Sequence, residues 1–170
     1  MSQIMDISGV GNFSNTDLTK MLAGKKVNVH ANVGKLTQGV NGSCSPKDFE
    51  TMMQLVYLGF TAPRKDAEAF ESWKSRTKAQ LESAEANPVY SINDSLGYAM
   101  YGNHPRFLNL KANMIDQVSL DRVYQMYLER YANAGDFTFF FVGNIDLEAA
   151  KPLIASYLGS LPSTGKKGQW

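Results

Sequence analysis

Hydrophobic residues along this 170-residue chain follow two different periods. Between residues 27 and 44, apolar and polar positions alternate, which predicts two strands, 27–33 and 36–44, in a half-buried antiparallel hairpin. Gly34 and Lys35 form the predicted turn between them. A nearly continuous apolar run at residues 137–142 predicts a central strand covered on both faces. The segment before Gly9 also has a strand-like composition, which makes four strand candidates for a small sheet.

Most of the remaining chain has the spacing of amphipathic helices. Ser14 and Asp17 have the pattern of a capping box at the start of a short helix. Residues 46–60 carry one continuous apolar stripe, and Pro63 ends that helix. The other predicted helices cover residues 64–86, 92–102, 119–131 and 146–158. Pro152 is poorly placed in the last of them. Helices segregated from an antiparallel sheet predict an α+β fold, with a small antiparallel sheet packed on one side by helices.

Charge and composition exclude several classes of partner. The chain has seventeen Lys and Arg residues and sixteen Asp and Glu residues. This balance of charge gives no case for a nucleic-acid or membrane-surface partner. No apolar stretch approaches the roughly 20 residues that a membrane span needs, and no signal peptide is visible. Cys44 is the single cysteine, so an internal disulfide is excluded while the compartment stays open. For a bacterial source, our working expectation is a periplasmic or cell-envelope location.

The candidate metal ligands are few and scattered. The chain has two histidines, His30 on the polar face of a predicted strand and His104 in a turn after a predicted helix. A tetrahedral zinc site needs three or four ligands around one point, so these histidines and Cys44 would have to meet through the tertiary fold. Surface or hydrogen-bonded histidines are the favoured interpretation, because no two histidines occur at helical spacing.

Other candidate chemistry has a structural alternative in each case. Cys44 shares a strand face with apolar residues, which favours inert packing over nucleophilic catalysis. No serine lies between glycines as in a nucleophile elbow, and the pair Gly9 and Gly11 is only a fragment of a dinucleotide fingerprint. Glu82 and Glu85 could form an acid pair, although solvated charges are commoner at such positions.

A stripe of tyrosines in the predicted helix 119–131 has two interpretations. Tyr124, Tyr127 and Tyr131 could form a wall that binds a peptide. Their spacing is that of a buried helical face, so core packing is the favoured interpretation.

Short segments in a shared order between about residues 5 and 165 carry a family resemblance. They are Asn12-Phe13-Ser14 with Asp17-Leu18, Leu22-Ala23-Gly24-Lys25, Ser43-Cys44-Ser45, Phe60-Thr61-Ala62-Pro63-Arg64, Tyr101-Gly102-Asn103-His104-Pro105, Tyr131 through Asn144, and Tyr157-Leu158-Gly159-Ser160-Leu161-Pro162. Together they resemble the non-catalytic, C-terminal half of the pitrilysin/insulinase-type zinc metallopeptidases, also called inverzincins.

The chain departs from that family in the residues of its chemistry. Catalytic halves carry His-x-x-Glu-His on a helix, where the histidines bind zinc and the glutamate is the general base. This chain has no such motif, and His104 matches only a turn histidine that is not a ligand in the family. The resemblance therefore implies no catalytic, cofactor-binding or metal-binding residue here, with zinc in the catalytic half of the parent protein.

The resemblance also implies a domain organisation and a partial metallopeptidase-like α/β sandwich. Residues 1–62 would end one peptidase-like domain, residues 63–165 would supply helices and the start of the following domain, and residues 166–170 would be a tail. The implied function is a non-catalytic segment of a zinc metalloendopeptidase that shapes the chamber for a peptide substrate and packs on the catalytic half.

Two other functions stay open at this point. One is a non-peptidase scaffold, or core subunit, of a larger assembly, and the other is an unrelated small α+β binding module. A His-x-x-Glu-His motif elsewhere in the parent protein would favour the peptidase, because that motif supplies the zinc ligands and the base.

Overall fold

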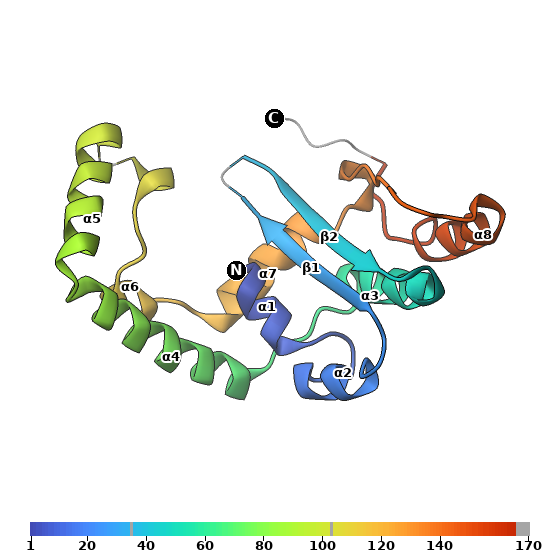
Figure 1. Cartoon of the computed structure of the whole chain (residues 1–170), viewed down its shortest axis with the longest axis horizontal. Helices are drawn as coiled ribbons and strands as arrows, with labels where there is room; N and C mark the ends of the chain where they lie inside the picture. The colour runs from blue at the N-terminus through green and yellow to red at the C-terminus, as the bar shows by residue number, and fades with distance from the viewer. Residues whose placement is uncertain (35, 103, 166–170) are drawn as a thin grey trace. The chain divides into compact units, whose positions relative to one another are not determined.

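The computed structural model describes residues 1–34, 36–102 and 104–165. Within these ranges the chain is mostly helical and contains one two-stranded sheet (Figure 1). It divides into two compact units. The first consists of Met1–Asp66 together with the chain from Val123 onward, and the second consists of Ala67–Arg122. The second unit is therefore an insertion into the sequence of the first.

The predicted hairpin is confirmed. Strands β1 (Val27–Val33) and β2 (Gln38–Cys44) pair antiparallel, with Val27 opposite Cys44 and Val33 opposite Gln38. The Gly34 amide donates to the Thr37 carbonyl at 2.8 Å and closes the loop between the strands. The turn predicted at Gly34 and Lys35 falls partly on Lys35, which lies outside the described residues.

Helix α3 (Phe49–Thr61) packs against both strands and forms the centre of the first core. The apolar stripe predicted for this helix is buried, and its buried members are Met52, Met53, Val56 and Phe60. A short 3-10 helix, η1 (Pro46–Asp48), leads into α3. The buried Asp48 carboxylate accepts hydrogen bonds from the Lys26 amide at 3.0 Å and the Ser45 hydroxyl at 2.5 Å. These bonds tie the start of α3 to the entry of β1.

Two later helices complete this core. Helix α7 (Leu120–Tyr131) buries Val123, Tyr127 and Tyr131, and a 3-10 turn, η3 (Ala134–Asp136), follows it. Helix α8 (Leu147–Tyr157) begins after Asp146, whose carboxylate accepts from two amides of the first turn. Pro152 lies inside α8, as the sequence indicated, so one amide of the helical ladder is missing there.

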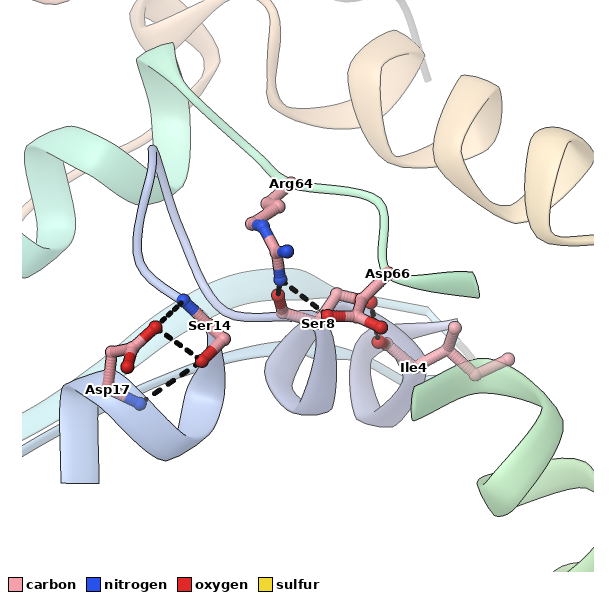
Figure 2. A network of polar contacts seen from close by, with 6 residues as sticks. All are labelled: Ile4, Ser8, Ser14, Asp17, Arg64 and Asp66. Atoms are coloured by element: carbon pink, nitrogen blue, oxygen red, sulfur yellow. Dashed lines mark hydrogen bonds and ion pairs between the residues drawn. The ribbon is translucent and has the colours of Figure 1, made fainter. Parts of the chain in front are cut away.

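The strand-like prediction for the N-terminus is wrong. Residues Ser2–Ser8 form helix α1, with Ile4, Met5 and Ser8 buried on one side. The Arg64 guanidinium donates to the Ser8 carbonyl at 2.8 Å and to Asp66 at 2.6 Å, which fixes the end of α1 (Figure 2). The local amino-acid composition favours a strand in this segment, whereas contacts with β1 and with Arg64 stabilise a helix.

The capping box predicted at Ser14 and Asp17 is confirmed at the start of α2 (Asn15–Met21). The Ser14 hydroxyl accepts from the Asp17 amide at 3.1 Å, while the Asp17 carboxylate accepts from the Ser14 amide at 3.2 Å (Figure 2). The Ser14 hydroxyl also donates to that carboxylate at 2.6 Å. These bonds lower the pKa of the Asp17 carboxyl and satisfy amides that the helix leaves without partners.

The central strand predicted at residues 137–142 is also wrong, because no strand pairing forms there among the described residues. The side chains nevertheless alternate: Phe137, Phe139 and Phe141 are partly buried, whereas Phe140 and Val142 are 84% and 97% exposed. The segment thus has the one-sided burial of a strand without a neighbouring strand. A continuous apolar run implies that both faces of the segment are buried. In the described residues only one of its two faces is packed against other side chains.

The second unit is helical. Its elements are α4 (Ala67–Glu85), α5 (Pro88–Tyr101), the 3-10 helix η2 (Pro105–Phe107) and α6 (Ala112–Ile115). Helix α6 packs on α4, where the Glu85 carboxylate accepts from the Ala112 amide at 2.8 Å and Lys78 pairs with Asp116 at 2.6 Å. The predicted helices 64–86 and 92–102 are therefore confirmed, with shifted ends.

Candidate docking groove

The residues considered as metal ligands do not fit a zinc ion. His30 lies 3.6 Å from the Asp6 carboxylate and is otherwise exposed, and His104 accepts a hydrogen bond from the Arg106 amide through Nδ1. His30 belongs to the first compact unit and His104 to the second. In the described ranges, no group of three His, Cys, Asp or Glu side chains could hold a metal ion. These side chains therefore do not provide the three or four ligands that a tetrahedral zinc site needs.

The thiol of Cys44 is in a poor setting for nucleophilic chemistry. It lies at the end of β2 and is half-buried. Burial, with a smaller contribution from the Asp48 carboxylate, raises the pKa of this thiol. A thiol with a raised pKa supplies less thiolate at neutral pH, so the packing role predicted for Cys44 is the better supported one.

Tyr127 and Tyr131 of α7 lie in the core, whereas Tyr124 is half-buried. Tyr131 is 1% exposed, and its hydroxyl donates to the carbonyls of Asn32 and Gly39 at 3.0 and 2.9 Å. The Tyr127 hydroxyl donates to the Gly59 carbonyl at 3.0 Å, and burial raises the pKa of both phenols. The Tyr131 ring also packs on Phe60 and Phe137. Core packing is therefore the correct alternative, because Tyr131 joins α7 to the hairpin and Tyr127 joins α7 to α3.

The remaining candidate motifs have local structural roles. Gly9 and Gly11 adopt positive φ angles of 82° and 55° in the turn between α1 and α2, and the Gly11 amide donates to the Ala62 carbonyl at 2.7 Å. A side chain on Gly9 would collide with the backbone of Phe13. Glu85 is used to hold the start of α6, so it is not half of an acid pair with Glu82.

A groove beside β2 is a feature of the described residues with binding potential. It has a volume of about 930 Å³ and lies within the first compact unit. One wall is β2, the other is formed by residues 136–146, and α3 and α8 supply Met52, Val56 and Leu153. Its size is that of a pocket able to enclose a sizeable ligand. In Figure 1 the segment that leads into α8 lies on the β2 side of the hairpin.

Aromatic contacts fix the far wall of this groove. Phe137 lies against Phe60 with ring centroids 5.0 Å apart, and Phe141 lies against Phe49 at 5.8 Å. These edge-to-face contacts hold the inner side chains of the segment on α3. Phe140 points away from this packing and is largely exposed. The apolar run at residues 137–142 was the sequence signal for this wall. Its prediction as a strand buried on both faces left no room for a groove.

Comparison with protein-family models gives a match at the end of the chain. Residues 117–170 match the model described as the Peptidase M16 inactive domain. This range begins just before α7 and includes the far wall of the groove and α8.

Two curated proteins are similar over longer stretches. The chain is 23% identical over 163 residues to a probable zinc protease PqqL of Haemophilus influenzae, covering 94% of this chain and 17% of the relative. It is 26% identical over 118 residues to a PQQL-like zinc protease of Arabidopsis thaliana, covering 68% and 12%. The chain therefore spans less than a fifth of the length of these relatives.

Two solved structures have the same fold over nearly the whole chain. A mutant of the ferredoxin protease FusC in complex with Arabidopsis ferredoxin matches with a TM-score of 0.78 at 12% identity, covering 99% of this chain and 19% of that one. The periplasmic protease PqqL of Escherichia coli matches with a TM-score of 0.77 at 21% identity, covering 96% of this chain and 18% of that one.

In the described residues, no helix is both long and apolar enough to cross a bilayer.

Proposed function

Since residues 117–170 match the Peptidase M16 inactive domain and the chain is distantly similar to PqqL-like zinc proteases, we propose that it is a non-catalytic segment of a zinc metalloendopeptidase. In this proposal it contributes no catalytic, cofactor-binding or metal-binding residue. It packs on a catalytic half and helps to shape the chamber in which a peptide substrate is cleaved.

One observation carries this proposal: a segment that matches an inactive domain lies in a fold that spans less than a fifth of much longer zinc proteases. The donor set supports it, because His30 and His104 are bound to other groups and are in separate units. The open groove beside β2 supports a packing role, because exposed apolar residues at its wall favour contact with more protein.

The domain organisation belongs to the same proposal. Residues 1–62 would end one peptidase-like domain and residues 63–165 would provide the start of the following one. Residues 166–170, interpreted as a tail, lie outside the described residues.

Reconstitution tests the function. The purified chain is mixed with the polypeptide of the same source that carries His-x-x-Glu-His, and cleavage of an unfolded peptide is measured. We expect binding, cleavage by the mixture, and no cleavage by this chain alone. Binding without cleavage by any mixture would favour the scaffold alternative.

Elemental analysis of the isolated chain provides an independent measurement. We expect no stoichiometric zinc after treatment with a chelator, because the described donors do not surround one point. Retention of about one zinc ion per chain, as expected for a complete site, would contradict the assignment of a non-catalytic role.

A further inference from the structure

The two outer edges of the hairpin are in different environments. At the β1 edge, the Asp6 carboxylate of α1 lies near the backbone of Ala31 and 3.6 Å from the His30 imidazole. Helix α1 packs along β1, so this edge is covered by the chain itself. Proteins commonly cover a strand edge in this way, because an open row of amides and carbonyls pairs readily with other chains.

The backbone register identifies which groups of β2 point outward. The Ser45 amide donates to the Lys26 carbonyl and the Gly34 amide donates to Thr37, so these two pairs belong to the hydrogen-bonded set. Bonded and non-bonded pairs alternate in an antiparallel ladder. The amides and carbonyls of Val40, Gly42 and Cys44 therefore point away from β1.

These outward groups face the groove. Residues 38–44 line it, and β1 is the only strand hydrogen-bonded to β2 in the described part of the chain. Across the groove, residues 137–142 have the alternating burial of a strand, again without a paired neighbour among the described residues. Two strand-like edges thus border one open, partly apolar space.

We propose that this groove receives an extended strand from the remainder of the M16-type polypeptide, which pairs with the outward edge of β2. This inference rests on the proposed function, because that function supplies the additional polypeptide. A strand fits the groove better than a helix, since a helix uses its backbone amides internally and would leave the β2 groups unpaired. The incoming strand would carry apolar side chains at alternate positions, facing Met52 and Val56.

Residue-resolved hydrogen exchange tests the proposal. The chain is compared alone and bound to the catalytic polypeptide of the same source. We expect exchange of the Val40, Gly42 and Cys44 amides to slow at least tenfold in the complex. The amides of Asn41 and Ser43 already bond to β1 and serve as internal controls whose exchange changes little.

The outcomes separate the two proposals. Binding without slower exchange of the outward amides would overturn the groove proposal and leave the proposed function standing. Absence of binding would overturn both.

Substitutions give a second, independent measurement. Val40→Pro removes an outward amide that the hairpin ladder does not use, so the hairpin is retained while strand addition is blocked. Phe140→Ser changes a side chain that is 84% exposed, and Leu36→Ser, at a residue 77% exposed in the hairpin loop, is its matched control. We expect Val40→Pro and Phe140→Ser each to weaken binding at least tenfold, and Leu36→Ser by less than twofold.

Folding of each variant is checked by circular dichroism before binding is measured. Phe140→Ser keeps the test decisive if Val40→Pro fails to fold. Unchanged affinity of folded Phe140→Ser would overturn the proposal, since the far wall would then make no contact with the bound polypeptide.

Discussion

Tyr131 is the residue whose change tests the packing of the first unit most directly. Its hydroxyl bonds to the carbonyls of Asn32 and Gly39, which face each other across the two strands. Tyr131→Phe removes these contacts and retains the ring. Tyr131→Ala removes the ring as well, and with it the packing on Phe60 and Phe137.

The magnitudes differ for a structural reason. The Asn32 and Gly39 carbonyls also belong to a ladder pair, so the loss of the hydroxyl leaves neither without a partner. One hydroxyl proton is shared between them, so the loss corresponds to a single net hydrogen bond. We therefore expect Tyr131→Phe to lower the free energy of unfolding by about 1 kcal/mol. Tyr131→Ala should cost roughly 3–5 kcal/mol, because it empties a fully buried aromatic site.

Urea unfolding followed by far-ultraviolet circular dichroism measures both values, with the slope of each transition as a check that one process is observed. Tyr124→Phe is the control, because its hydroxyl donates to the Pro63 carbonyl at a longer 3.3 Å from a half-buried position. A loss for Tyr124→Phe equal to that for Tyr131→Phe would refute the assigned role of the hairpin contact. A loss above about 3 kcal/mol for Tyr131→Phe would show that the two carbonyls depend on the hydroxyl alone.

Two further predictions concern Asp6 and Pro152. Burial raises the pKa of Asp6, while His30 and the Ala31 backbone oppose this shift, so the folded chain binds a proton more readily than the unfolded chain. The contribution of Asp6 to stability should then fall as pH rises from the unfolded pKa of about 3.9 through the higher folded pKa, and Asp6→Asn should flatten this part of the curve in urea titrations. Identical slopes in both proteins would contradict the shift. Pro152→Ala restores an amide that can donate to Glu148 inside α8, and we expect it to raise the free energy of unfolding by about 1–3 kcal/mol in the same assay. A loss of stability would show that α8 needs the proline to pack Ala150 in the core.

The hairpin and α3 were predictable because their signals are local. Alternation along β1 and the stripe of α3 each place apolar residues on a single face, and the structure buries those faces. The capping box at Ser14 was predictable for the same reason, since it involves residues three positions apart.

The absence of strand pairing at residues 137–142 and the helix α1 were not predictable from the sequence, because each depends on distant parts of the chain. The apolar run indicates a strand, but pairing requires a neighbour that the described chain does not place beside it. Helix α1 is seven residues long and is held by β1 and Arg64, which no local pattern reveals. The candidate groove was missed for a related reason: its walls come from residues about 100 positions apart.

The insertion of Ala67–Arg122 into the first unit has an engineering consequence. The hydroxyl of Tyr124 lies 3.3 Å from the Pro63 carbonyl, and Lys65 lies over the Tyr124 ring, so the two cut points of the first unit are neighbours. A few glycine and serine residues joining Asp66 to Val123 could therefore replace the whole insert without stretching the backbone. The hairpin with its surrounding core can in this way be produced as a minimal module for study.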